Sequence, residues 1–138
     1  MEVSEPKNIY NFENRLVRFA GEVILYLRKL KKDYELDYYS KQIIRSSGSA
    51  ALNYGEAQGT VTSKDFINKM SLVVKELKES RTTLKILNYV YSNEDEKRNW
   101  LLSECEELIA ISSKMILNKK QTWRCNCNWY FDLKTHNS

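Results

Sequence analysis

Residues that break helices are almost absent from this chain, and their scarcity constrains the fold more than any other feature. The 138 residues include one proline and four glycines, and Pro6 lies outside every segment that shows a regular pattern. An all-β domain would need a turn about every eight to twelve residues, with glycine or proline in many of them. We therefore expect long helices, and the length suits one domain with one hydrophobic core.

Apolar residues recur at helical spacing in the first and third parts of the chain. In residues 8–32 they alternate at spacings of four and three, which places them on one helix face. Residues 62–91 carry the clearest seam of this kind, interrupted only by Ser80, and Thr62 or Ser63 can cap its first turn. The seams consist of Phe12, Leu16, Phe19, Val23, Tyr26 and Leu30, and of Phe66, Met70, Val73, Leu77, Leu84, Leu87 and Tyr91.

Two further segments have the character of helices. Residues 38–57 are rich in small side chains, so we expect a buried helix that packs closely against a neighbour. In residues 93–120 a broad apolar stripe follows Asn93 and Glu96, which resemble a capping box, and two lysines suit the helix end. Because the connections are short, consecutive helices should run antiparallel. The sequence thus predicts an all-α, up-down-up-down four-helix bundle over residues 1–120.

The last part of the chain, residues 121–138, lacks a clear helical period. It combines large aromatic side chains with two cysteines among polar residues. Leaving such aromatics in water is unfavourable, so we expect this tail to dock on its own bundle or on a neighbouring subunit. The residues concerned are Trp123, Cys125, Cys127, Trp129, Tyr130 and Phe131.

Composition narrows the cellular setting. The chain starts without a basic region followed by an apolar stretch, and no apolar run is long enough to span a bilayer, so we expect neither a signal peptide nor membrane insertion. Three cysteines do not suit a secreted disulfide framework, which makes the cytoplasm the expected location. The net charge of +4 permits binding to nucleic acid without requiring it.

A line of polar residues crosses the helix that is rich in small side chains. Its members are spaced four, four and three, so they share one face, and polar groups buried there need partners. Two interpretations remain open: a structural network that fixes helix register or a subunit interface, and a site for a ligand or nucleic acid. The line consists of Arg45, Ser49, Asn53 and Glu56, and the expected partners in the third helix are Glu76, Glu79 and Ser80.

Patterns that support catalysis or metal binding are weak. The carboxylates of the line have no histidine or cysteine close by in the sequence, and the only histidine, His136, lies in the tail. Cys125 and Cys127 could hold zinc only with Cys105 and His136, and the spacing fits no common zinc pattern. Glu-x-x-His pairs typical of di-iron bundles and phosphate-binding glycine loops are both missing from the sequence. We therefore expect no enzyme activity, no cofactor and no metal site.

Basic residues form stripes on the first and third predicted helices. Such residues usually lie on a solvated face, which is the simpler interpretation. If several subunits place these stripes side by side, their summed field attracts RNA or DNA. The residues concerned are Arg15, Arg18, Lys29 and Lys32 in the first helix, and Lys75, Lys78 and Lys85 in the third.

The second and third predicted helices resemble a known family, the four-helix bundle proteins encoded in 23S rRNA intervening sequences. The accessory variability determinant of diversity-generating retroelements is similar to that family. The resemblance covers about residues 8–118, and its most specific part is the run Arg-Ser-Ser-x-Ser-x-x-x-Asn-x-x-Glu. Where the family has Glu-Gly, this chain has Glu56-Ala57. The matching residues run from Gln42 to Ser49 and continue with Asn53, Glu56-Ala57, Ser63, Asp65-Phe66, Glu76-Leu77 and Glu79-Ser80.

The resemblance implies a homopentameric barrel and a bacterial cytoplasmic protein. For the retroelement relatives it also implies binding to a reverse transcriptase and to nucleic acid. We therefore expect a non-enzymatic oligomer that binds RNA, DNA or a nucleic-acid-processing partner such as a reverse transcriptase through its basic helix faces. A purely structural homo-oligomer with no nucleic-acid role is the alternative, and in both cases the matched polar residues would determine fold and assembly.

Overall fold

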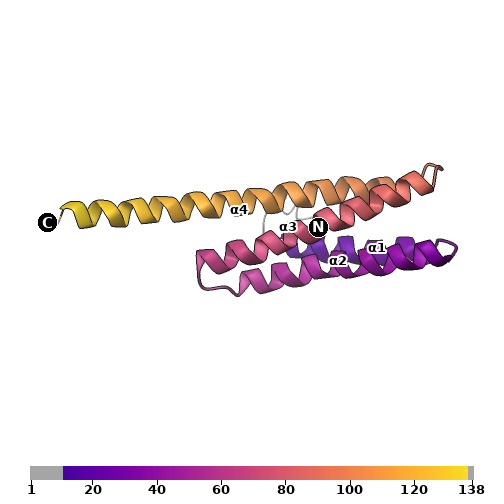
Figure 1. Ribbon diagram of the computed structural model, residues 1–138, viewed down its shortest axis with the longest axis horizontal. Helices are drawn as coiled ribbons and strands as arrows, with labels where there is room; N and C mark the ends of the chain where they lie inside the picture. Colours follow the sequence, from indigo (N-terminus) through magenta and orange to yellow (C-terminus); the bar gives the residue numbers. More distant parts are fainter. Residues whose placement is uncertain (1–10, 137–138) are drawn as a thin grey trace, which may run out of the picture.

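Four helices make up the fold. The structure is a computed structural model that describes the backbone of residues 11–136 and the side chains of residues 11–125. Consecutive helices turn at alternate ends, so neighbours run antiparallel (Figure 1), and no strand occurs within the described backbone. The predicted all-α four-helix bundle is therefore confirmed. The helices are α1 (Phe12–Arg28), α2 (Tyr34–Gln58), α3 (Ser63–Val90) and α4 (Glu96–His136).

The hydrophobic core lies between the four helices, which contact one another in the ring α1–α2–α3–α4–α1. The two predicted seams line it: Leu16 and Phe19 of α1 and Leu77 of α3 are fully buried. Phe66 and Tyr91, at the two ends of the α3 seam, are only partly buried. Burying one such apolar side chain stabilises the fold by about 1.5–3 kcal/mol, so the seams determine which way each helix faces.

Side-chain caps fix where α2 and α3 begin. Thr62 Oγ1 accepts a hydrogen bond from the backbone N–H of Asp65 at 3.1 Å, which confirms Thr62 as the cap of α3. Asp33 Oδ1 accepts one from the backbone N–H of Leu36 at 2.7 Å, so α2 begins at Tyr34, ahead of the predicted residue 38. An aspartate at this position satisfies one of the free N–H groups of the first turn.

The capping box predicted at Asn93 is wrong. Helix α4 begins at Glu96, and Asp95 Oδ1 accepts a hydrogen bond from the backbone N–H of Arg98 at 3.0 Å. Asn93 lies in the preceding loop, where its carbonyl accepts a hydrogen bond from Arg98 Nη2 at 2.6 Å. Aspartate and asparagine serve equally well as caps, so the residue type alone does not select the position.

A buried arginine holds the α3–α4 connection against the bundle. Arg98 is 2% exposed. Its guanidinium donates to Asn88 Oδ1 and to the carbonyl of Tyr91 at 2.9 Å each, and to the hydroxyl of Tyr26 at 3.3 Å. These acceptors are neutral oxygens near the carboxyl end of α3, where the helix dipole favours a positive charge.

Helix α4 continues far beyond its predicted end. The sequence predicts an end at residue 120, but the helix runs on to His136, and its last part extends past the other helices (Figure 1). The backbone of the tail thus continues α4 and its last part does not fold back on the bundle, while the expected docking on a neighbouring subunit stays a prediction. Residues 121–136 contain neither proline nor glycine, so they hold no strong stop signal. The tail side chains outside the described residues are Cys127, Trp129, Tyr130 and Phe131.

Candidate functional site

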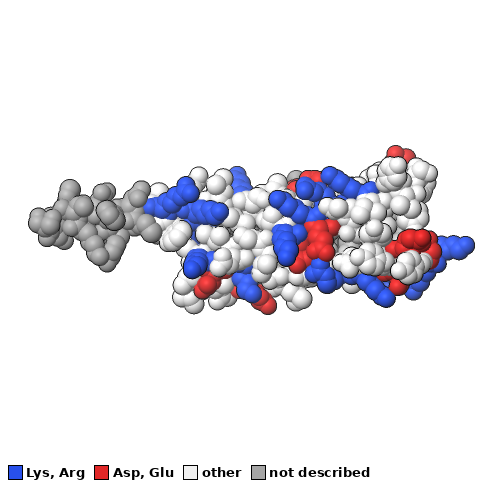
Figure 2. Space-filling model, in the orientation of Figure 1, with Lys and Arg blue, Asp and Glu red and all other residues white. Residues whose placement is uncertain are grey.

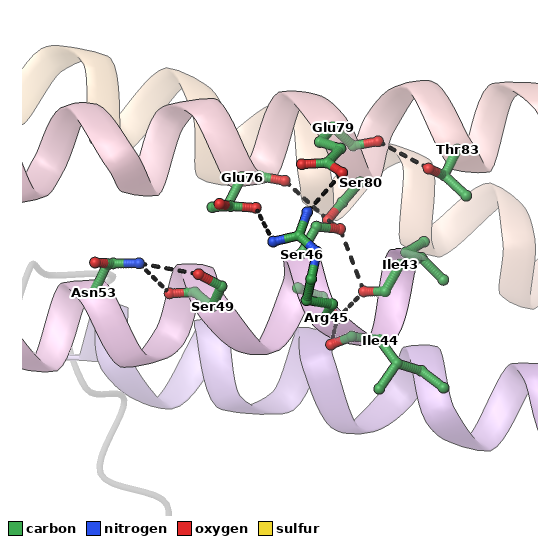
Figure 3. A network of polar contacts seen from close by, with 11 residues as sticks. Ile43, Ile44, Arg45, Ser46, Ser49, Asn53, Glu76, Glu79, Ser80 and Thr83 are labelled. Atoms are coloured by element: carbon green, nitrogen blue, oxygen red, sulfur yellow. Dashed lines mark hydrogen bonds and ion pairs between the residues drawn. The ribbon is translucent and has the colours of Figure 1, made fainter. Parts of the chain in front are cut away.

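The predicted polar line of α2 meets α3 at one arginine. Arg45 Nη2 lies 2.6 Å from Glu79 Oε1, and Arg45 Nη1 lies 3.2 Å from Glu76 Oε2 (Figure 3). The hydrogen bond from Arg45 lowers the pKa of Glu79 below its usual value. However, 52% of the Arg45 side chain is exposed, against 11% for Glu76. Within one chain the contact therefore lies at the surface, so Arg45 is not buried inside the bundle, and its predicted role at a subunit interface stays a prediction.

The other members of the line do not join the arginine. Asn53 donates to the carbonyl and hydroxyl oxygens of Ser49 one turn earlier, at 2.9 and 3.0 Å (Figure 3). Glu56 pairs with Lys69 of α3 at 2.6 Å, and its side chain is 59% exposed. The spacing therefore identifies a shared helix face correctly. That face is partly solvent-exposed and makes separate local contacts in place of one network.

Ser80 contacts a residue outside the predicted line. Its hydroxyl oxygen lies 2.7 Å from that of Ser46, and it also donates to the carbonyl of Glu76 at 3.0 Å. Both serines are fully buried, and their small size lets α2 and α3 lie close together, as the sequence predicts. Gly48 takes no part in this approach, because a Cβ there would meet no atom of another helix within 4 Å.

These polar contacts suit a structural role better than catalysis. A carboxylate with a lowered pKa stays deprotonated, so Glu79 is a poor general acid at neutral pH. Among residues with described side chains, no three His, Cys, Asp or Glu come together to hold a metal ion. Cys105 and Cys125 lie twenty positions apart in one helix, about 30 Å along its axis, so they cannot share an ion. Cys127 and His136 lie outside the described side chains.

Membrane insertion has no support in the described helices. None of them combines the length and the apolar character that crossing a bilayer requires. The lipid bilayer would demand about 20 consecutive apolar residues.

Two of the four basic residues predicted for the first helix are engaged within the chain. Arg15 Nε lies 2.9 Å from Glu104 Oε1, and Arg15 Nη2 lies 3.1 Å from Glu107 Oε1. The guanidinium carbon of Arg18 lies 4.9 Å from the centre of the Trp100 ring, a cation–π contact. Arg15 is therefore neutralised by its partners. The other two predicted cations of this region are exposed at the end of α1 and in the following loop, namely Lys29 and Lys32.

The lysines of α3 form a stripe with unpaired positive charge. Lys75, Lys78 and Lys85 are exposed and lie on one helix face, because their spacings of three and seven match whole turns. Within the part of the chain whose side chains are described, none of the three forms an ion pair. We call these three residues the α3 lysine stripe. These three lysines belong to the residues for which the sequence predicts contact with nucleic acid.

A basic surface that the sequence did not predict lies where α4 leaves the bundle. A groove of about 200 Å³, here called the junction groove, lies between the start of α3 and the middle of α4. The sequence analysis places the end of the fourth helix at residue 120, so Lys120 falls in that helix and Trp123 and Arg124 fall in the predicted tail. The spacing i, i+3, i+4 in both helices is the signal that would have located it. Its lining residues are Lys64, Ile67 and Asn68 of α3, and Lys120, Trp123 and Arg124 of α4.

Comparison with known proteins provides a family and a fold. The family model described as 23S rRNA-intervening sequence protein matches residues 11–114. The chain is also similar to a crystal structure of a protein with unknown function from the S23 ribosomal protein family, from Bacteroides thetaiotaomicron VPI-5482, with a TM-score of 0.68 and 24% sequence identity. That similarity covers 76% of this chain and 97% of the other. No curated protein matches the sequence. The α4 side of the junction groove lies outside the residues that the family model matches.

Proposed function

The chain belongs to the 23S rRNA-intervening sequence protein family, and from this premise we propose that it is a non-enzymatic, homo-oligomeric protein of the cytoplasm that binds RNA or DNA. The α3 lysine stripe supports the binding of nucleic acid. Exposed apolar residues on the adjacent helices α1 and α2, here called the apolar face, support assembly into an oligomer; they are Val17, Ile44 and Leu52. The polar contacts between α2 and α3 have the structural task of holding these faces in place.

The observation that carries the proposal is the unpaired charge of the α3 lysine stripe. Arg15 already has two carboxylate partners, whereas none of the three lysines of the stripe forms an ion pair among the described side chains, although the charge of Lys75 helps to lower the pKa of Glu79. A cation that contacts a phosphate releases a condensed counterion, which favours binding and makes it salt-dependent. In an oligomer, copies of the stripe act together, because their fields add.

Exposed apolar residues around two glycines support the oligomer. Ile44 and Leu52, which are 42% and 72% exposed, lie one turn before and after Gly48, and Val17 lies one turn before Gly21 on α1. A glycine inside a helix costs about 1 kcal/mol relative to alanine. Neither glycine is needed for packing within the chain, because a Cβ at either would meet no other helix within 4 Å. A second subunit close to this face would account for both features.

The same apolar face favours a second candidate function, a purely structural homo-oligomer with no nucleic-acid role. In that case the exposed lysines serve only to keep the assembly soluble. The two functions differ in a measurable property, because only the first requires affinity for nucleic acid that falls as salt rises.

Titration with structured RNA and with duplex DNA at several salt concentrations tests the proposal. The variant Lys75→Glu/Lys78→Glu/Lys85→Glu should bind more weakly than the wild type. The control for a single charge reversal elsewhere on the surface is Lys41→Glu, to be compared with Lys78→Glu alone, because Lys41 is also exposed but already pairs with Asp37 at 3.0 Å. Absence of wild-type binding at low salt would overturn nucleic-acid binding and leave structural assembly as the function.

A further inference from the structure

One face of α3 and one face of α4 form the junction groove, and the lining residues have the same spacing in both helices. In α3 and in α4 the lining residues stand at positions i, i+3 and i+4, which lie side by side on a helix surface. The groove lies where α4 begins to extend past the bundle, so one wall belongs to the bundle and the other to the start of the extension (Figure 1). A ligand in it would contact both parts of the protein.

The junction groove is basic. Three of its six lining residues are cations, Lys64, Lys120 and Arg124, and none is acidic. Within the described side chains none of these cations takes part in an ion pair. In Figure 2 the Lys and Arg atoms gather on α4 beside the grey end, with no Asp or Glu among them. A concave surface with uncompensated positive charge attracts anions.

The junction groove also has an aromatic wall. Trp123 is 49% exposed, and it stands between the two α4 cations in sequence. A single exposed aromatic residue is ordinary on a protein surface. Its combination with cations in one groove is more specific, because proteins hold single-stranded nucleic acid with a basic track for the backbone and aromatic rings on which bases stack.

We propose that the junction groove binds single-stranded RNA or DNA, with Trp123 stacked on an unpaired base while Lys64, Lys120 and Arg124 contact phosphates. This rests on the proposed nucleic-acid-binding function, and it adds a second surface with a preference for one type of strand. In a duplex the bases stack on one another and offer no face to the indole. A duplex would therefore engage only the cations of the groove.

Other occupants satisfy fewer of these groups. A second copy of this chain would have to desolvate three cations in a groove that holds no carboxylate, which is unfavourable. The centres of protein interfaces are accordingly depleted of charged residues. An acidic peptide would satisfy the cations, but it would offer a ring to Trp123 only where an aromatic residue stands beside its carboxylates. A single strand supplies phosphates and aromatic bases within one ligand.

Titration of the full chain with a labelled thymidine oligonucleotide, and with a duplex of equal length, tests this inference. Trp123→Ala should weaken single-strand affinity by about 5- to 150-fold, the effect of losing one stacked base, and leave duplex affinity near wild type. Trp123→Phe, which keeps an aromatic face, should retain most of the affinity. The matched control is Tyr89→Ala, which removes an aromatic side chain that is 90% exposed outside the junction groove.

A second variant tests the cations. Lys120→Gln/Arg124→Gln should reduce the slope of log affinity against log salt by about 1.4 on the single strand, because each phosphate contact contributes about 0.7. If the wild type binds but neither this variant nor Trp123→Ala changes single-strand affinity, the junction-groove site is overturned and nucleic-acid binding stands. Equal losses for duplex and single strand in Trp123→Ala would overturn the strand preference. Absence of any wild-type binding would refute the proposed function itself, and this site with it.

Discussion

Replacing Arg98 with alanine should destabilise the fold substantially. The side chain is 2% exposed and donates to four oxygens at 2.6–3.3 Å. A hydrogen bond to a charged group contributes about 1.5–3 kcal/mol. Asn88 and Asn93 are exposed, so water can replace the guanidinium as their hydrogen-bond partner. Tyr26 is buried and Tyr91 is half-buried, so the Tyr26 hydroxyl and the Tyr91 carbonyl lose a partner that water does not readily replace. We therefore expect the free energy of unfolding to fall by about 2–4 kcal/mol.

Urea unfolding followed by far-ultraviolet circular dichroism measures this loss. Arg98→Lys keeps the charge but lacks the planar fork that reaches several acceptors, so its loss should be intermediate. Arg28→Ala removes an exposed arginine from the last turn of α1 and should stay within about 0.5 kcal/mol of the wild type. A loss for Arg98→Ala no larger than that of Arg28→Ala would refute the reasoning that this buried charge ties the α3–α4 connection to the bundle.

Three further predictions concern charge, thiols and assembly. Because Arg45 lowers the pKa of Glu79 from its usual 4.5, that carboxylate contributes stability that is present above pH 4.5 and is lost as the pH falls through the lowered pKa. Arg45→Gln should reduce this acid sensitivity in thermal melts and, since the arginine is half exposed, cost about 1 kcal/mol or less at neutral pH. Burial raises the pKa of Cys105 to about 12, so peptide mass spectrometry should find thiol reagents on exposed Cys125 quickly and on Cys105 only after unfolding. Leu52→Asp should keep the helical circular dichroism but lower the mass measured by light scattering, and an unchanged mass would count against the apolar face as a subunit contact.

Features that depend on helix geometry alone were predictable from the sequence. The alternation of four and three places Leu16, Phe19 and Met70 on inward faces whatever the neighbours are, and all three are fully buried. Thr62 likewise caps α3 through a contact within one turn. Such short-range patterns carry their physical cause in the sequence itself.

Features that depend on distant residues were harder to predict. The spacing of Arg45 and Asn53 shows that they share a helix face. It does not show whether that face points toward α3 or toward solvent, so the burial of Arg45 does not follow from the sequence. The end of α4 was misplaced because two lysines favour a helix end without enforcing one. Arg98, by contrast, did carry a signal. It lies three residues before Leu101 and seven before Cys105, in register with the buried stripe, and an arginine at a core position requires polar partners.

The salt dependence of binding to duplex DNA tests the proposed function most directly. Each phosphate contact adds about 0.9 to the slope of log affinity against log salt, so three lysines should account for about 2.7 of it. The predicted result is a steep slope for the wild type that becomes shallower by about this amount in Lys75→Glu/Lys78→Glu/Lys85→Glu and not in Lys41→Glu. Equal slopes for the wild type and the triple variant, or no binding at low salt, would contradict the proposal.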